Sequence, residues 1–284
     1  MSQPSRIRCR EIETGDPAFA RHFRVRARQA FVRFALERLV EHATPAGCPR
    51  YGYLLEADGI AVGVLLMIYA SVLTDGVSKL RCCFSSWYVE PEFRVYAPVM
   101  VTRALKHKHV TYFNISPAPH TLPILDALGF QRYCSGMFTA VPALSRRLEG
   151  VRVEAVSPTV CRPGADLPSA DLELLERHAR FGCASLVCRA GDGSHPFVFA
   201  LRRKYGLRYA YLVYCRSQQE FVRFAGPLGR FLAGRGVALV GLDADGPIPG
   251  LVGRYTPGRP KYFLGPDQPR LGDLAYSERA MLWQ

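Results

Sequence analysis

The chain has 284 residues, of which 49% are hydrophobic, and its 37 Lys and Arg outnumber its 24 Asp and Glu to give a formal net charge of +13. This composition supplies a buried core and excludes an intrinsically disordered chain, and the length predicts two domains. The longest apolar stretch, residues 60–73, is too short to cross a membrane, and residues 1–10 lack the apolar centre of a signal peptide. We therefore expect a cytoplasmic globular protein with no membrane span.

The positive charge is spread over both halves of the chain and favours an anionic partner. CoA, an RNA or another acidic polymer, and an anionic membrane surface all fit this charge. A solvated arginine-rich surface explains it equally well, and the sequence contains no recognisable RNA-binding motif.

The nine cysteines have no regular spacing and form no CxxC pair, which predicts neither a zinc site nor a disulfide framework. The nearest approach to a ligand cluster is His178, Cys183 and Cys188. Free buried cysteines pack as small hydrophobic residues, so we interpret this cluster as part of the core and expect no metal cofactor.

The first half of the chain alternates helical and extended patterns. Apolar spacing predicts a long helix over residues 17–42, and Ala57-Asp58-Gly59 between two apolar runs predicts a β-hairpin. Gly129 is suited to the left-handed position that ends a helix. The further predicted elements are a strand at 80–89, a helix at about 96–106, a strand at 110–115, a helix ending at 129 and a strand at 133–141.

The same order recurs in the second half. A helix is predicted at 171–181 with Ser169 or Asp171 as its cap, followed by strands at 185–189, 196–202 and 207–215, a passage through 225–228 into a helix ending near 234, and a strand at 237–242. The interval from Glu92 to Val110 is 18 residues (110 − 92), and that from Glu220 to Val237 is 17 (237 − 220). We interpret this as an internal repeat that divides the chain into domains 1–148 and 149–284. Residues 243–250 are rich in turn formers and cannot form the long helix expected after that strand, which predicts a degenerate second copy.

The end of the strand at 80–89 carries the most informative motif. Val89-Glu90-Pro91-Glu92-Phe93-Arg94 is followed by Val95-Tyr96-Ala97-Pro98-Val99, an order that predicts a turn opening a helix, where free backbone N–H groups and the helix dipole favour a phosphate. The segment resembles the acyl-CoA-binding core of the GNAT superfamily, the acyl-CoA-dependent N-acyltransferases. The resemblance implies an α/β protein of two GNAT-like domains, each a mixed, splayed β-sheet flanked by helices.

The resemblance also implies where the cofactor binds. The pyrophosphate of acetyl-CoA or another acyl-CoA is expected at the turn, and the pantetheine arm is expected along the strand that ends at Val89. Trp87 precedes the turn and is either a wall of the cleft or a core residue. The expected cofactor-binding residues are Trp87, Val89, Arg94, Val95, Tyr96, Ala97, Val99 and Asn114.

The chain departs from the family pattern in the turn, where Ala97 and Val99 stand at the positions of the family's small, N–H-exposing residues, and at two positions after it. Pro98 has no N–H to offer a phosphate. Leu125 stands where the family often has a Tyr that acts as the general acid, and Ala118 replaces an expected Asn. Ser116 and His120 follow the strand at 110–115 and are the candidate catalytic residues, because ligands of open α/β sheets bind beyond the carboxyl ends of the strands. The alternative is that Asn114 and Ser116 satisfy backbone groups and that His120 is an exposed loop residue.

These observations predict an N-acyltransferase that transfers an acyl group from acyl-CoA to an amine of unknown identity. The missing Tyr and Asn, the proline in the turn and the positive charge favour a second hypothesis, a catalytically inactive GNAT-like protein that binds an anionic partner. A third hypothesis keeps the tandem fold but takes the acyl group from an aminoacyl-tRNA.

Overall fold

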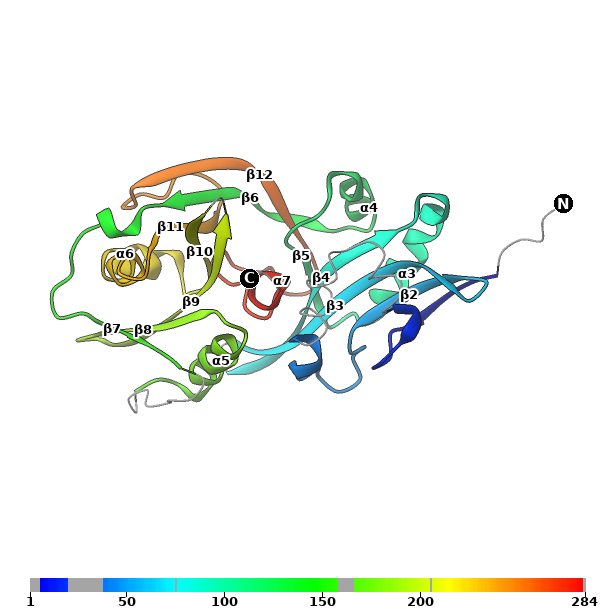
Figure 1. Ribbon diagram of the computed structural model, residues 1–284, viewed down its shortest axis with the longest axis horizontal. Coiled ribbons are helices and arrows are strands. Elements are labelled where there is room, and N and C mark those ends of the chain that lie inside the picture. The colour runs from blue at the N-terminus through cyan, green and yellow to red at the C-terminus, as the bar shows by residue number, and fades with distance from the viewer. Residues whose placement is uncertain (1–5, 20–37, 75, 158–165, 205, 283–284) are drawn as a thin grey trace. The chain divides into compact units, whose positions relative to one another are not determined.

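The computed structural model describes residues 6–19, 38–74, 76–157, 166–204 and 206–282 (Figure 1). The chain forms two compact units that interleave along the sequence. Unit 1 comprises Met1–Gln131 and Tyr262–Gln268, and unit 2 comprises Arg132–Lys261 and Pro269–Gln284. Each unit is an α/β structure with its own strands and helices.

Unit 1 is built on antiparallel strands followed by one parallel pair. β1 (Ile7–Glu11), β2 (Gly52–Ala57), β3 (Ile60–Thr74) and β4 (Val77–Val89) pair in chain order and antiparallel. β5 (Thr111–Asn114) then runs parallel to β4, and the last residues of β12 (Gly253–Leu264) pair antiparallel with β5. The helices are η1 (Pro91–Tyr96), α3 (Ala97–Ala104), η2 (Pro119–Thr121) and α4 (Leu122–Ala127).

Local sequence explains the turns of unit 1. Asp58 and Gly59 have φ angles of 50° and 80°, the left-handed values that a two-residue hairpin turn requires, so the predicted hairpin is confirmed. Gly129 also has a positive φ, 83°, and its N–H donates to Asp126 O after α4, as predicted. Of the helix predicted over 17–42, residues 20–37 lie outside the described part of the chain.

The core of unit 1 lies between its sheet and its helices. Tyr53 and Leu65 from the sheet pack with Met100 and Val101 of α3 and with Leu125 of α4, and all five are buried. The helix that follows the candidate turn is thereby fixed against the sheet.

Unit 2 follows the same pairing order. β7 (Arg152–Ala155), β8 (Ala184–Ala190), β9 (Gly193–Lys204) and β10 (Leu207–Tyr214) are antiparallel neighbours, and β11 (Val237–Ala244) is parallel to β10. β6 (Gln131–Ala140) pairs antiparallel with β11 and neighbours β12. The helices are η3 (Pro142–Leu144), α5 (Ser169–Arg180), α6 (Gln218–Ala233) and α7 (Glu278–Met281).

Two helix starts in unit 2 differ from expectation. The N-cap of α5 is Pro168, with no side-chain cap, so the prediction of Ser169 or Asp171 as cap is wrong. α6 begins at Gln218 and continues through Pro227, so residues 225–228 lie inside the helix and not before it. A Cβ on Gly226 would lie 2.0 Å from Arg146 O, which shows how closely the backbone after η3 approaches the helix at this point.

Candidate functional site

The two strands of the parallel pair of unit 1 end at different points. Paired residues run from Arg81 and Thr111 to Phe84 and Asn114, where β5 ends, whereas β4 continues to Val89. β3 pairs with this extension on its other side, up to Val89. The extension of β4, residues 85–89, therefore continues beyond its pairing with β5.

The extension of β4 is bulged. Val64 pairs with Tyr88 and Leu66 pairs with Ser85, so Ser86 and Trp87 together oppose Leu65 on β3. Ser86 has a φ of 46°, in the left-handed region that a serine rarely adopts. A bulge at this point redirects the backbone N–H and C=O groups of the strand, and bulges are common beside binding sites.

The segment after β4 is helical from its first residues and is not an open turn. Phe93 N–H donates to Glu90 O at 2.9 Å, and Ala97 N–H donates to Arg94 O where η1 joins α3. No glycine lies between Glu90 and Val99 to supply the positive φ with which a loop directs successive N–H groups outward. The expected phosphate-binding turn therefore has fewer free backbone N–H donors than the sequence pattern predicted. The absence of glycine from this segment was the sequence signal for its helical conformation.

The predicted cofactor-binding side chains of this segment have different surroundings. Val89 and Ala97 are buried and Trp87 is half-buried, so these three help to hold the end of β4 and the start of α3. Arg94, Val95, Tyr96 and Val99 are exposed, Val95 to 76%. An arginine and three apolar side chains thus face solvent beside the end of β4.

The candidate catalytic residues lie beyond β5. Asn114 is buried, and its Oδ1 accepts the N–H of Ser116 at 3.1 Å, so this side chain orders the backbone that leaves the strand. Ser116 is exposed, and His120 is exposed within η2. Leu125, at the position of the family's Tyr, is completely buried in the core, and Ala118 is the N-cap of η2. The structure joins Asn114 to Ser116 by a hydrogen bond.

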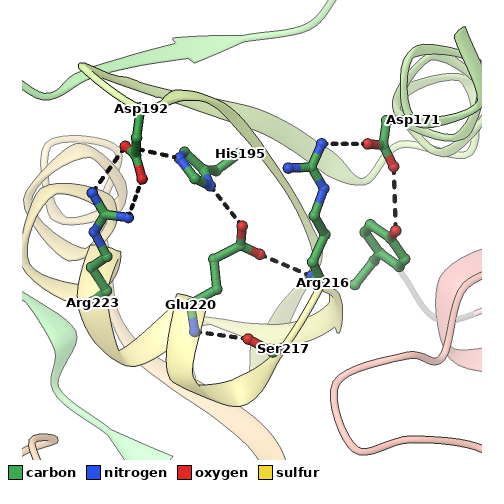
Figure 2. A network of polar contacts seen from close by, with 8 residues as sticks. Asp171, Asp192, His195, Arg216, Ser217, Glu220 and Arg223 are labelled. Carbon is green, nitrogen blue, oxygen red and sulfur yellow. Dashed lines mark hydrogen bonds and ion pairs between the residues drawn. The ribbon is translucent and has the colours of Figure 1, made fainter. Parts of the chain in front are cut away.

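A second polar cluster, which sequence reasoning missed, lies in unit 2 (Figure 2). His195 of β9 contacts Glu220 through Nδ1 at 2.7 Å and Asp192 through Nε2 at 3.4 Å. Arg223 of α6 binds both oxygens of Asp192, and the guanidinium holds the pKa of that carboxyl well below its usual value. The ring of His195 lies against Phe224, with centroids 4.5 Å apart.

The same cluster fixes the start of α6. Ser217 Oγ accepts the N–H of Glu220 at 3.1 Å, and Glu220 Oε2 accepts the N–H of Arg216 at 3.0 Å (Figure 2). The Ser217 bond is the first half of a capping box, whereas the Glu220 carboxylate accepts the N–H of Arg216, the residue before the N-cap, and not that of Ser217. The sequence signal for this arrangement was Ser217-Gln218-Gln219-Glu220. One carboxylate therefore caps the helix and holds a histidine, which explains the cluster as a device that attaches α6 to the sheet.

A third cluster is buried in the sheet of unit 2. Lys261 and Tyr211 both donate to Oδ1 of Asp243, and all three side chains are almost completely buried. The guanidinium of Arg279 lies 4.1 Å from the ring centroid of Tyr211, and burial raises the pKa of that phenol. The pairing neutralises the buried charges, as an interior requires.

The cysteine and histidine cluster noted in the sequence is part of the packing. His178 bonds through Nδ1 to Leu174 O, its Nε2 accepts the N–H of Tyr276, and Cys183 Sγ donates to Ala280 O. Burial raises the pKa of the Cys188 thiol to about 12. Within the described ranges, no group of three or more His, Cys, Asp or Glu is arranged to hold a metal ion.

Comparisons of the sequence with protein-family models and with curated proteins find no match. Solved structures do match. A GCN5-related N-acetyltransferase from Anabaena variabilis superposes with a TM-score of 0.58 at 10% identity, over 91% of this chain and 72% of that one. One from Kribbella flavida gives 0.55 at 14% identity, over 91% and 71%. A protein from Pyrococcus horikoshii that is assigned as an acetyltransferase gives 0.58 at 14%, over 95% and 93%.

The chain therefore has the fold of the GCN5-related N-acetyltransferases, as the sequence resemblance predicted. Identities of 10–14% carry the similarity of fold alone. None of the helices in the described part of the chain combines the length and apolar character needed to cross a bilayer.

Proposed function

We propose that the chain is an acyl-CoA-dependent N-acyltransferase whose donor site is the extension of β4 in unit 1. The observation that carries this proposal is that β4 continues beyond its pairing with β5, which ends at Phe84 and Asn114, together with the bulge at Ser86 and Trp87. The pantetheine arm of a CoA thioester is an extended chain with two amides, and it pairs with the edge of β4 as an added strand would.

The chemistry follows from that position. A backbone N–H of the bulge polarises the thioester carbonyl, and the amine nitrogen of the acceptor attacks it. The C–S bond breaks, the thiolate leaves as CoA, and the proton of the amine passes to a base. His120 and Ser116, which follow β5, are the candidates for proton transfer. A thiolate leaves readily, so the missing Tyr reduces the rate without preventing the reaction.

Arg94 is the proposed contact for the phosphates. The helical start of the segment leaves few free N–H groups, so an exposed guanidinium takes over part of their role. Val95, Tyr96, Ala97 and Val99 line the same path in the proposal, and Trp87, Val89 and Asn114 form its base.

The proposal keeps the division into two related domains near residue 148, with the donor site in the first. It places the enzyme in the cytoplasm, with acetyl-CoA or a longer acyl-CoA as donor and an unidentified amine as acceptor. Unit 2 is proposed not to bind a second CoA.

Calorimetric titration with CoA, acetyl-CoA and longer acyl-CoAs, at low and moderate salt, tests the donor site. We expect binding that persists in salt, and we expect Arg94→Glu to weaken it by about tenfold or more, because a charge-assisted contact is replaced by repulsion. Arg152→Glu is the matched control, because Arg152 is exposed on β7 of unit 2. Equal affinities in the two variants would remove Arg94 from the site, and no binding of any acyl-CoA would refute the proposal.

A second function, binding without catalysis, is favoured by the hydrogen bond that occupies the Ala97 N–H and by Leu125 in place of an acid. Acyl transfer to a panel of primary amines, followed as release of free CoA, separates the two. Turnover that falls in His120→Ala or Ser116→Ala supports the enzyme. Acyl-CoA binding with no CoA release from any amine supports the binding protein.

A further inference from the structure

Unit 2 contains a pocket of about 420 Å³ at the amino-terminal ends of its parallel strands. It lies where β9 meets β10, beside the last turn of α6 and the first residue of β11. The carboxyl ends of β10 and β11, where an acyl-CoA site would lie in this fold, are at the other end of the same strands. The pocket is therefore a separate feature, and its interpretation does not rest on the proposed function.

The wall of the pocket is apolar. Leu201 of β9, Leu232 of α6 and Val237 of β11 line it. Leu201 is 37% exposed although it belongs to a strand, whereas Leu232 and Val237 are buried behind it. Leu207 and Leu239, near the same strand ends, are 69% and 38% exposed. Apolar surface that remains open to solvent in a pocket is typical of a site that binds the apolar part of a ligand.

The charge of the pocket has one sign. Arg202, Arg203, Arg208 and Arg235 line it, and no acidic side chain is among its described lining residues.

Other arginines of unit 2 are neutralised by carboxylates. Arg189 pairs with Glu154 and Asp166, Arg216 with Asp171, and Arg223 with Asp192. In contrast, Arg203, Arg208 and Arg235 pair with no carboxylate among the residues that the structure describes. The charge of these three arginines is thus not compensated by a described ion pair, and an anionic ligand would compensate it.

Two of these arginines are already held in position. The guanidinium of Arg235 stacks on Phe231, 3.6 Å from the ring centroid, and its Nη1 donates to Phe231 O at 3.3 Å. Arg208 Nη1 donates to Arg235 O at 3.4 Å. A guanidinium has five N–H donors, so these contacts fix the groups and leave other donors for a ligand.

We propose that this pocket binds an amphiphilic phosphate, with the phosphate on the arginines and the apolar body against Leu201, Leu232 and Val237. Arginine forks match the geometry of a phosphate, and the volume is that of a small-molecule site. Such a ligand is either a free alkyl phosphate or the headgroup of an anionic phospholipid.

Titration of the full chain with butyl, hexyl and octyl phosphate below their aggregation limits tests the proposal, with inorganic phosphate and octyl glucoside as probes of each half of the ligand. We expect the affinity to rise by about threefold for each added methylene, because each one leaves water. Arg203→Ala/Arg208→Ala is expected to reduce the affinity for octyl phosphate by about 30-fold or more. Arg152→Ala/Arg254→Ala removes the same charge from exposed positions elsewhere in unit 2 and is expected to change it by less than about twofold. Leu201→Ser should weaken octyl phosphate and leave inorganic phosphate unchanged.

Sedimentation with vesicles of phosphatidylcholine, alone or with phosphatidic acid, distinguishes the source of the ligand. Binding of octyl phosphate that the pocket variant loses supports the proposal with a free ligand. Binding of the acidic vesicles alone, lost in the same variant and kept in its control, supports it with a lipid. Affinity independent of alkyl length, equal losses in both double variants, or binding of neither probe would overturn it. A steeply salt-dependent affinity for tRNA without binding of octyl phosphate would also overturn it.

Discussion

The two units share a pairing order and differ at the end of the parallel pair. In each, four antiparallel strands lead to a fifth that is parallel to the fourth. In unit 1, β4 runs past the end of β5. In unit 2, β10 pairs with β11 only as far as Tyr211, and the C-terminal segment takes the edge beyond that pair.

In unit 2, the C-terminal segment pairs with the end of β10 through an antiparallel bridge between Tyr214 and Asp273. Leu274 N–H donates to Val213 O at 2.7 Å, and Cys215 N–H donates to Gly272 O at 2.9 Å. β9 occupies the other edge of β10 as far as Tyr214, so the C-terminal segment lies on the edge that faces β11. The two units therefore share the order of strands and differ in what pairs with the fourth strand beyond the end of the parallel pair.

The units also differ in where they place charge. In unit 1, Lys79 pairs with Asp267 at the surface, with side chains 35% and 42% exposed. In unit 2, Lys261 pairs with Asp243 in the interior, with side chains 2% and 1% exposed. The same two residue types thus form one exposed and one buried ion pair, and we expect loss of the buried pair to change the free energy of unfolding far more.

The largest effect is expected from breaking the interior pair. Lys261→Met leaves the carboxylate of Asp243 buried without its cation, so we expect the free energy of unfolding to fall by about 3–5 kcal/mol. Lys79→Met makes the same chemical change in unit 1 and should cost less than about 1 kcal/mol, because water screens the exposed pair. Urea denaturation measures both. Equal costs would show that burial of the pair is unimportant.

The next largest effect on stability is expected in the C-terminal segment that pairs with the end of β10. Leu274 is completely buried, so Leu274→Ala should cost about 3 kcal/mol of unfolding free energy. Leu207→Ala, at a position 69% exposed, should change it by less than about 0.5 kcal/mol. Hydrogen exchange at the amides of Cys215 and Leu274 should accelerate in the first variant only. Unchanged exchange at these two amides in Leu274→Ala would mean that the pairing of the C-terminal segment with β10 does not depend on the Leu274 side chain.

The sequence predicted the fold well because the signals of its elements are local. The Asp58-Gly59 turn, the apolar run of β3 and the glycine after α4 each specify an element within a few residues. The strands of unit 2 and the absence of a helix at 243–250 followed from the same kinds of pattern. These features depend on backbone preferences that neighbouring residues set.

The site was predicted less completely, because its determinants are not local. The bulge at Ser86 is defined by pairing with Leu65, which no spacing within β4 reveals. The C-terminal segment meets β10 across about sixty residues of chain, and the Arg235 side chain joins Arg203 and Arg208 only in the folded unit. The sequence could have predicted that a helix starts at Pro91, because proline at the first helical position and the lack of glycine both favour a helix there.

A smaller effect on the free energy of unfolding is expected from Asp16, near the start of unit 1. Asp16 is buried, binds the guanidinium of Arg10 and accepts the N–H groups of Ala18 and Phe19, and Arg10 is the main reason that its pKa is lowered from 3.8. A carboxyl with a lower pKa in the folded state stabilises the fold above the unfolded value and loses that contribution as the pH falls through the folded value. Asp16→Asn should therefore cost about 2 kcal/mol at neutral pH and should reduce the loss of stability below pH 3.8.

Asp126→Asn is the control for that measurement, because Asp126 is exposed on α4 of the same unit. Urea denaturation between neutral pH and pH 3 should give parallel profiles for this variant and the parent chain. A profile of Asp16→Asn that also runs parallel to the parent would contradict the assignment of acid sensitivity to Asp16.

The smallest effect tests how the two units begin the helix after the fourth strand. α6 begins at Gln218, and the Oγ of its N-cap, Ser217, accepts the N–H of Glu220 (Figure 2). In contrast, α3 continues from η1, and its N-cap, Tyr96, makes no side-chain cap. Ser217→Ala should cost about 1 kcal/mol of unfolding free energy, because the Glu220 N–H loses its partner. Ser169→Ala removes a serine from the first turn of α5, where Pro168 is the N-cap, and should cost clearly less. If the two variants are equally stable, the cap does not stabilise α6, and the difference between the helix starts of the two units has no energetic consequence.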